Sequence, residues 1–174
     1  MKHLLMAVIG CLLGISAHAQ IQGDSQATIY RKPYNLEGPR IGVSYLSHDF
    51  VNTMQSRRHV TLSPLVAQFG WQFERRFFSL KDGFTAVTEW IPLVGGFEQE
   101  KFLPSLSWMV GARTGNGFEF GAGPNVSLSG TAVVIAAGVT MGGGQVNFPI
   151  NLAVVLSKSG PRFGLIMGFN IKDE

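Results

Sequence analysis

The sequence predicts an all-β fold: an eight-stranded antiparallel up-and-down transmembrane β-barrel, preceded by a cleaved signal peptide. The first observation is a period of two near the C-terminus, where Phe163, Leu165, Met167 and Phe169 are separated mainly by small residues. The second is that similar stretches recur along the chain, while helical periodicity stays weak. The third is that charged residues make up only 14% of the chain, against about a quarter in soluble domains.

The N-terminal residues Met1–Ala19 are predicted to be a signal peptide. Lys2 supplies the positive charge, Leu4–Leu13 the apolar segment and Ala17–Ala19 the cleavage site. A rival interpretation is a lipoprotein signal ending before Cys11, which leaves an apolar segment shorter than the usual ~7–15 residues. With ordinary cleavage the mature chain has no cysteine, which excludes disulfide and thiolate chemistry.

The net charge does not indicate nucleic-acid binding. Without Lys2 the chain carries 13 basic and 11 acidic side chains, a net charge of +2. Export through the inner membrane makes a nucleic-acid partner less plausible still. No stretch after the signal reaches ~18 consecutive apolar residues, so no transmembrane helix is predicted.

Three segments are predicted: a signal peptide (1–19), an N-terminal lead-in without a clear period (20–39) and a barrel domain (40–174). Short connectors such as Thr114–Gly117 imply antiparallel neighbours, and the longest connector is Asp49–Ser63. The third strand is ambiguous in phase; if Glu89 faces the polar side, Trp90 faces the apolar side. The eight predicted strands are Arg40–His48, Leu65–Arg75, Phe84–Val94, Ser105–Arg113, Phe118–Ser127, Ala132–Met141, Gln145–Leu156 and Phe163–Ile171.

The composition of the polar face indicates that the apolar face meets lipid. A water-facing strand surface carries many charged residues, whereas this face is mostly Gly, Ser, Asn and Gln. Lys or Arg facing lipid near the bilayer midplane costs about 2–4 kcal/mol, which explains why lysines and aspartates avoid the predicted strands. The residues that we expect to face lipid include Phe69, Trp71, Trp108, Phe120, Phe148, Leu165, Met167 and Phe169.

The charges that do fall in strands lie on the opposite face, which would line the lumen. An isolated buried charge is very costly, so these groups must pair inside a narrow barrel. We therefore predict one internal network of charges, formed by Glu74, Glu89, Arg113, Glu119 and Arg162.

At this level the segment Arg40–Ile171 resembles the small eight-stranded outer-membrane barrels of the OmpA-transmembrane-domain and OmpX kind. The resemblance is architectural and implies a cell outer-membrane location, a monomer, and membrane lipid and the barrel-assembly machinery as partners. Barrels of that kind usually end on a strand with a terminal aromatic residue. Here Phe169 is followed by Asn170-Ile171 and then by Lys172-Asp173-Glu174, which departs from that pattern.

Candidate catalytic residues are limited to His48 and His59. With Ser47, Asp49 and Ser56 they supply the residue types of a nucleophile, a base and an orienting acid, but their spacing matches no known motif. Neither histidine has a nearby cysteine or paired glutamate, so no metal site and no cofactor are expected.

The basic pair Arg57-Arg58 in the same connector is interpreted as a solvated charge run, with lipid phosphates as the alternative ligand. The function predicted from the sequence is a non-enzymatic envelope protein whose lumen is polar and filled by side chains. One alternative is an outer-membrane lipid-modifying hydrolase. The other is a secreted, soluble, lipocalin-like ligand-binding barrel with an apolar lumen.

Overall fold

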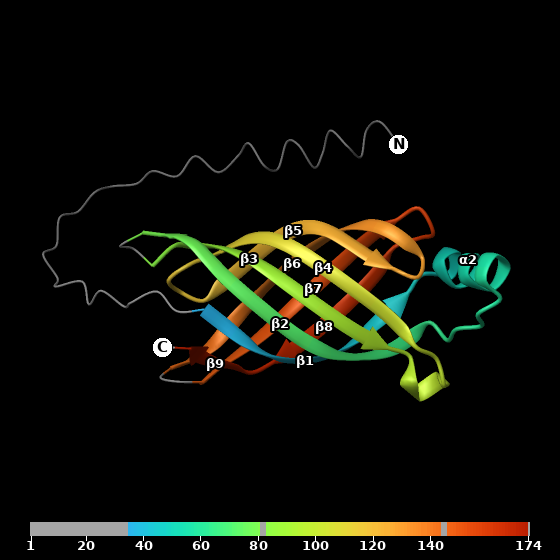
Figure 1. Cartoon of the computed structure of the whole chain (residues 1–174), viewed down its shortest axis with the longest axis horizontal. Helices are drawn as coiled ribbons and strands as arrows, with labels where there is room; N and C mark the ends of the chain where they lie inside the picture. Colours follow the sequence, from blue (N-terminus) through green and yellow to red (C-terminus); the bar gives the residue numbers. More distant parts are fainter. Residues whose placement is uncertain (1–34, 81–82, 144–145, 174) are drawn as a thin grey trace, which may run out of the picture.

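The computed structural model describes residues 35–80, 83–143 and 146–173, so the predicted signal peptide and most of the predicted lead-in lie outside it. The strands form one antiparallel sheet that curls into a barrel (Figure 1). Their bounds are β1 (Asn35–Leu46), β2 (Leu65–Ser79), β3 (Thr85–Gly95), β4 (Leu103–Arg113), β5 (Phe118–Ser127), β6 (Gly130–Gly143), β7 (Val146–Ser157), β8 (Arg162–Gly168) and β9 (Asn170–Asp173).

The barrel closes because β1 pairs with β2 on one side and with β8 on the other. From β2 to β8, each strand pairs with its neighbour in sequence. The last two strands, β8 and β9, both lie between β7 and β1, and only Phe169 separates them. They are two parts of one interrupted strand, so the barrel has eight positions around its circumference and the predicted fold class is confirmed.

The first strand differs from the prediction at both ends. It begins at Asn35, inside the predicted lead-in 20–39, because Asn35–Glu37 pair with β9. In the rest of β1 the apolar residues point outward, whereas here the apolar Leu36 is buried and the charged Glu37 is half-buried. The alternation of apolar residues therefore does not predict this part of the strand. The strand ends at Leu46 instead of His48, because Ser47 begins a helix.

That helix, α2 (His48–Arg58), corrects the prediction of an unstructured connector over Asp49–Ser63. Ser47 caps it, with its hydroxyl accepting a hydrogen bond from the Phe50 N–H at 3.3 Å. Only Phe50 and Met54 of the helix are buried, so its apolar stripe is too narrow to produce a clear helical period. Among the described residues no helix is long and apolar enough to cross a membrane.

The barrel has two distinct ends (Figure 1). One carries α2 and the short 3₁₀ helix η1 (Phe97–Gln99), while the start of β1 and the end of β9 lie at the other. Lys172 and Asp173 belong to β9, so the expectation that all lysines and aspartates lie outside strands was wrong at these two positions. They occupy the last residues of the strand at the barrel end, and the lipid penalty applies to the midplane.

Inward-facing glycines allow the wall to curve this tightly. A Cβ atom at Gly123 would lie 1.9 Å from the Trp108 carbonyl oxygen, a distance that no side chain tolerates. A Cβ atom added at Gly38, Gly70 or Gly168 would likewise lie 1.9–2.2 Å from a neighbouring backbone oxygen. The glycines are therefore a packing requirement of the barrel.

Candidate functional site

The interior of the barrel holds most of the buried polar and charged side chains of the described chain. They come from all parts of the wall because alternate residues of every strand point inward. Buried side chains of this kind are Arg40, Ser44, Gln72, Glu74, Ser107, Glu119, Asn125, Asn147, Arg162 and Asn170.

Arg113, the last residue of β4, organises a cluster of charges toward the end of this interior that lies opposite α2. Its Nη1 and Nη2 atoms donate to the two carboxylate oxygens of Glu74 at 3.0 and 2.5 Å, a bidentate pair. Its Nε atom donates to Glu119, which lies directly opposite it on β5. Glu119 also accepts from the Thr140 hydroxyl at 2.6 Å. One guanidinium therefore binds two carboxylates, and these contacts join the three strands β2, β4 and β5.

Glu89 is linked to Arg40 through the neutral side chain of Gln72. It lies opposite Glu74 in the β2–β3 register and accepts a hydrogen bond from Gln72 Nε2 at 2.8 Å. Gln72 Oε1 in turn accepts from Arg40 Nε at 3.0 Å. Glu89 lines the lumen and Trp90 is 45% exposed, which is the phase the sequence favoured for this strand.

Arg40 is the functional residue that sequence reasoning missed. The sequence pattern predicts only that it begins the first strand, yet it is 1% exposed and donates hydrogen bonds to Gln72 and to the Pro39 carbonyl, the latter at 2.9 Å. Its Nη2 atom has no hydrogen-bond partner among the residues that the structure describes. The sequence contains a signal for this, since Arg40 lies two and four residues before Gly42 and Ser44 and therefore shares the polar face of the predicted strand.

Arg162 does not join the glutamates, contrary to the single network predicted. Its Nη2 atom donates to Asn125 Oδ1 at 2.8 Å, and Asn125 Nδ2 donates to Ser107 Oγ at 2.9 Å. Its guanidinium carbon lies 5.1 Å from the centre of the Phe50 ring, a cation–π distance. Arg162 thus belongs to a separate polar layer beneath α2.

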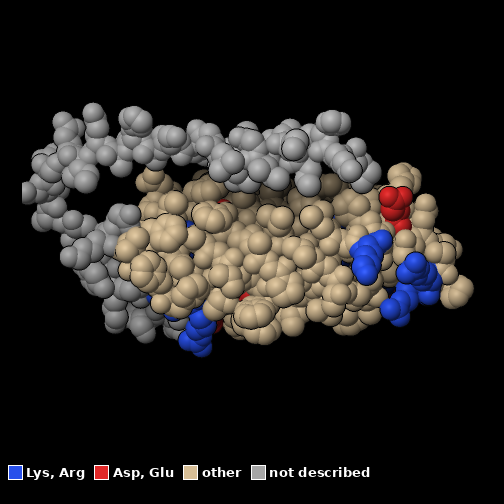
Figure 2. Space-filling model, turned by 90° about the horizontal axis from the view of Figure 1, so that it is seen from above, with Lys and Arg blue, Asp and Glu red and all other residues tan. Residues whose placement is uncertain are grey.

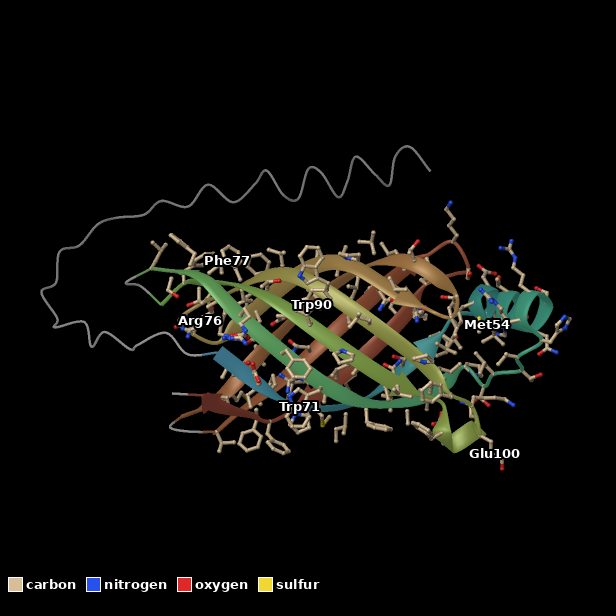
Figure 3. All side chains as sticks on the ribbon, viewed as in Figure 1. Met54, Trp71, Arg76, Phe77, Trp90 and Glu100 are labelled. Carbon is tan, nitrogen blue, oxygen red and sulfur yellow. The ribbon has the colours of Figure 1, made fainter. Side chains whose placement is uncertain are left out.

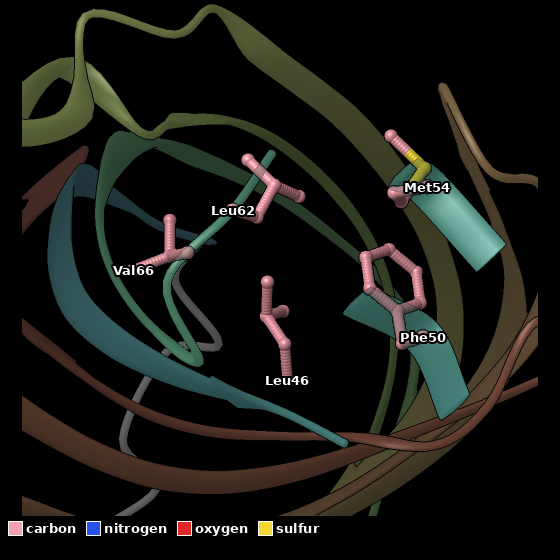
Figure 4. Close-up of a cluster of buried hydrophobic side chains, with 5 residues drawn as sticks. All are labelled: Leu46, Phe50, Met54, Leu62 and Val66. Carbon is pink, nitrogen blue, oxygen red and sulfur yellow. The ribbon is translucent and has the colours of Figure 1, made fainter. Parts of the chain in front are cut away.

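An apolar cap closes the barrel mouth at the α2 end. The cap consists of Phe50 and Met54 from the helix packed on Leu46, Leu62 and Val66, and all five side chains are buried (Figure 4). Below it the main cavity of the interior has a volume of about 80 Å³. One water needs at least about 10–15 Å³, so this space holds a few waters and no wide pore.

The outer wall is apolar over most of its length. On the face shown in Figure 2, most charged side chains gather toward the two ends of the barrel. Trp71 and Trp90 lie on the wall between α2 and the end marked by Arg76 and Phe77 (Figure 3). All eight residues expected to face lipid are 37–53% exposed: Phe69, Trp71, Trp108, Phe120, Phe148, Leu165, Met167 and Phe169.

A stacked tryptophan pair occupies this wall. Trp90 and Trp108 lie opposite each other on β3 and β4, with ring centres 5.7 Å apart. The Trp108 indole N–H donates to the Thr88 hydroxyl at 2.9 Å, so its polar group is satisfied without water. That arrangement suits a hydrocarbon environment, where an unpaired donor is costly.

The candidate catalytic residues do not form a site. His48 begins α2 and His59 ends it, and both are exposed. Ser47 is used as the helix cap, and Ser56 donates to the Thr53 carbonyl at 3.3 Å. In the described ranges no side-chain hydrogen bond joins either histidine to a serine or an acid, and no group of three His, Cys, Asp or Glu residues could hold a metal ion.

Comparisons with known proteins bear on the fold. No protein-family model and no curated protein matches the sequence. The outer membrane protein Ail of Yersinia pestis, in a phospholipid bilayer nanodisc, matches with a TM-score of 0.50 and 10% identity over 80% of this chain and 99% of that one. The Ail crystal structure gives 0.49 and 12% over 81% and 100%. A de novo designed transmembrane β-barrel gives 0.48 and 11% over 82% and 98%.

At these identities the likeness concerns fold alone, and the first of these matches carries it. It agrees with the closed register of the strands and with the apolar outer wall. The chain has the fold of a small eight-stranded transmembrane β-barrel.

Proposed function

We propose that this chain is a sealed outer-membrane β-barrel with a structural role in the cell envelope. The observation that carries the proposal is the reversal of polarity across the wall. Large apolar side chains point outward, whereas Glu74, Arg113 and Glu119 are brought together inside. A soluble barrel distributes these groups the other way, because its charged surface faces water.

Two obstacles seal the lumen. The first is the charge cluster, in which Arg113 on β4 bonds both to Glu119 on the neighbouring strand β5 and to Glu74 on β2, a strand with which β4 does not pair. The second is the apolar cap under α2, which covers the polar layer of Arg162 and Asn125. An eight-stranded barrel is just wide enough to be filled by side chains, so this polar filling leaves no continuous channel.

The partners that follow are membrane lipid along the outer wall and the barrel-assembly machinery during insertion, with a monomer as the final state. Backbone groups in a bilayer must all be paired, and the β1–β8 closure pairs the two edges of the sheet. A second chain is therefore not needed to complete the sheet. No catalytic role is proposed, because the geometry of His48 and His59 supports none.

Conductance in a planar lipid bilayer tests the sealed lumen. We expect the wild-type barrel to insert without long-lived current steps. A variant that removes both obstacles, with Glu74→Ala, Arg113→Ala and Glu119→Ala in the cluster and Phe50→Ala and Met54→Ala in the cap, should conduct more ions than the wild type. Stable current steps of wild-type protein, as large as those of this variant, would show that the lumen is an open channel.

A further inference from the structure

An apolar trough crosses the outer wall at the seam where the barrel closes. Three rows of outward side chains run across β1, β2 and β8 there. The middle row pairs Val43 with Ala67 and with Leu165. The rows on either side of it are bulkier: Tyr45, Leu65 and Phe163 form one, and Ile41, Phe69 and Met167 form the other.

Ala67 makes the floor of the trough low. Its outward neighbours along β2 are Leu65 and Phe69, which are 60% and 52% exposed. A methyl group between two large side chains leaves a gap, and the groove there has a volume of about 710 Å³. This is within the roughly 300–1,000 Å³ range of small-molecule sites.

The helix η1 forms a side wall of the trough. Its Phe97 ring stacks on Phe69 with ring centres 5.3 Å apart, and Phe102 meets Phe97 edge-on at 6.1 Å. Phe97 is 52% exposed and lines the groove together with Glu98. The stack makes a side wall that the strands alone do not provide.

Side chains of η1 hold that wall in place by bonding to backbone groups of β2 that would otherwise pair with a neighbouring strand. Glu98 Oε1 accepts from the Ala67 N–H at 3.2 Å, and Gln99 Nε2 donates to the Leu65 carbonyl at 2.8 Å. These are backbone groups that β3 does not reach, since its register with β2 begins at Gln68. The anchoring uses one carboxylate oxygen of Glu98, and most of the other residues that line the groove are apolar.

We propose that this trough is a binding site for one acyl chain of a membrane lipid, which rests on the proposed membrane location. The trough continues the apolar outer wall, so the surrounding solvent is hydrocarbon and the natural occupant is a lipid tail. Association within lipid depends on van der Waals packing, and a preformed groove offers contact on three sides where flat wall offers one. The lipid at this seam is held longer than lipid on the rest of the wall.

Photo-crosslinking in vesicles tests the site. The full barrel is reconstituted in phosphatidylcholine vesicles containing a small fraction of phosphatidylcholine with a diazirine in one acyl chain, and crosslinked peptides are mapped by mass spectrometry. We expect crosslinks concentrated on the peptides of Val43, Ala67 and Leu165. The variant Ala67→Phe fills the trough and should lose that concentration.

Two further variants make the test specific. Ala122→Phe adds the same bulk at an exposed alanine of β5 and should leave the trough crosslinks unchanged. Phe97→Ala lowers the side wall from an exposed position and should reduce them without affecting folding.

The outcomes separate this site from the proposed function. Even labelling of the whole wall, unaffected by Ala67→Phe, would overturn the trough while leaving a membrane barrel. Absence of labelling anywhere on the wall would overturn the membrane location and the trough together.

Discussion

Replacing Arg113 with alanine is the sharpest test of the internal charge cluster. Arg113 makes two hydrogen bonds to Glu74 and one to Glu119, and the two carboxylate side chains are 0% and 11% exposed. The substitution leaves both acids buried without a cation. Breaking a buried ion pair by removing one partner costs about 3–5 kcal/mol.

The free energy of unfolding is measured by urea titration in lipid vesicles, with fluorescence of the wall tryptophans as the probe. We expect Arg113→Ala to lower it by about 3–5 kcal/mol. Arg57→Ala, which removes an exposed arginine of α2, is the control and should change it by no more than about 0.5 kcal/mol. In a Glu74→Gln, Glu119→Gln background the same substitution should cost less, because no uncompensated acid remains. Equal effects of Arg113→Ala and Arg57→Ala would refute the claim that the cluster stabilises the barrel.

Three further predictions follow from the wall, the glycines and the cap. Leu165→Lys should block membrane assembly, because a lysine that faces lipid near the midplane costs about 2–4 kcal/mol. Asn151→Lys, which points inward, should reduce the folded fraction in membranes less. Gly123→Ala should prevent folding because its Cβ would meet the Trp108 carbonyl at 1.9 Å, whereas Gly121→Ala, with its nearest contact at 3.2 Å, should fold; two variants that fold equally well would disprove this reason for glycine. Phe50→Ala should lower the opening free energy of α2 by about 3–5 kcal/mol in amide hydrogen exchange, while the exposed Asn52→Ala should leave it unchanged.

Much of the wall could be predicted from the sequence because a barrel strand repeats every two residues. The fifth strand was predicted at its observed bounds, Phe118–Ser127, since Phe118, Phe120 and Ala122 alternate with a glutamate and glycines and turn residues flank both ends. The last strand followed from the same period, but its interruption at Phe169 did not. Phe169 continues the alternation of apolar residues whether or not its backbone pairs with the neighbouring strands, so the sequence does not reveal the break.

The features at the barrel ends could not be predicted in this way. α2 buries only Phe50 and Met54, and the signals that would have revealed it were the Ser47 cap, Asp49 in the first turn and the basic last turn. The partners inside the lumen also escaped the sequence. Parity predicts that Arg162 points inward, but only the three-dimensional stagger of the strands decides that it meets Asn125 instead of a glutamate.

Heat-modifiability of the protein in an isolated outer-membrane fraction tests the membrane barrel most directly. Boiled and unboiled samples are compared on an SDS gel, because a folded membrane barrel resists SDS and migrates differently until it is boiled. We expect the protein in the outer-membrane fraction with a clear shift on boiling. Protein in the soluble periplasmic fraction, with no shift, would contradict the assignment of the apolar wall to lipid.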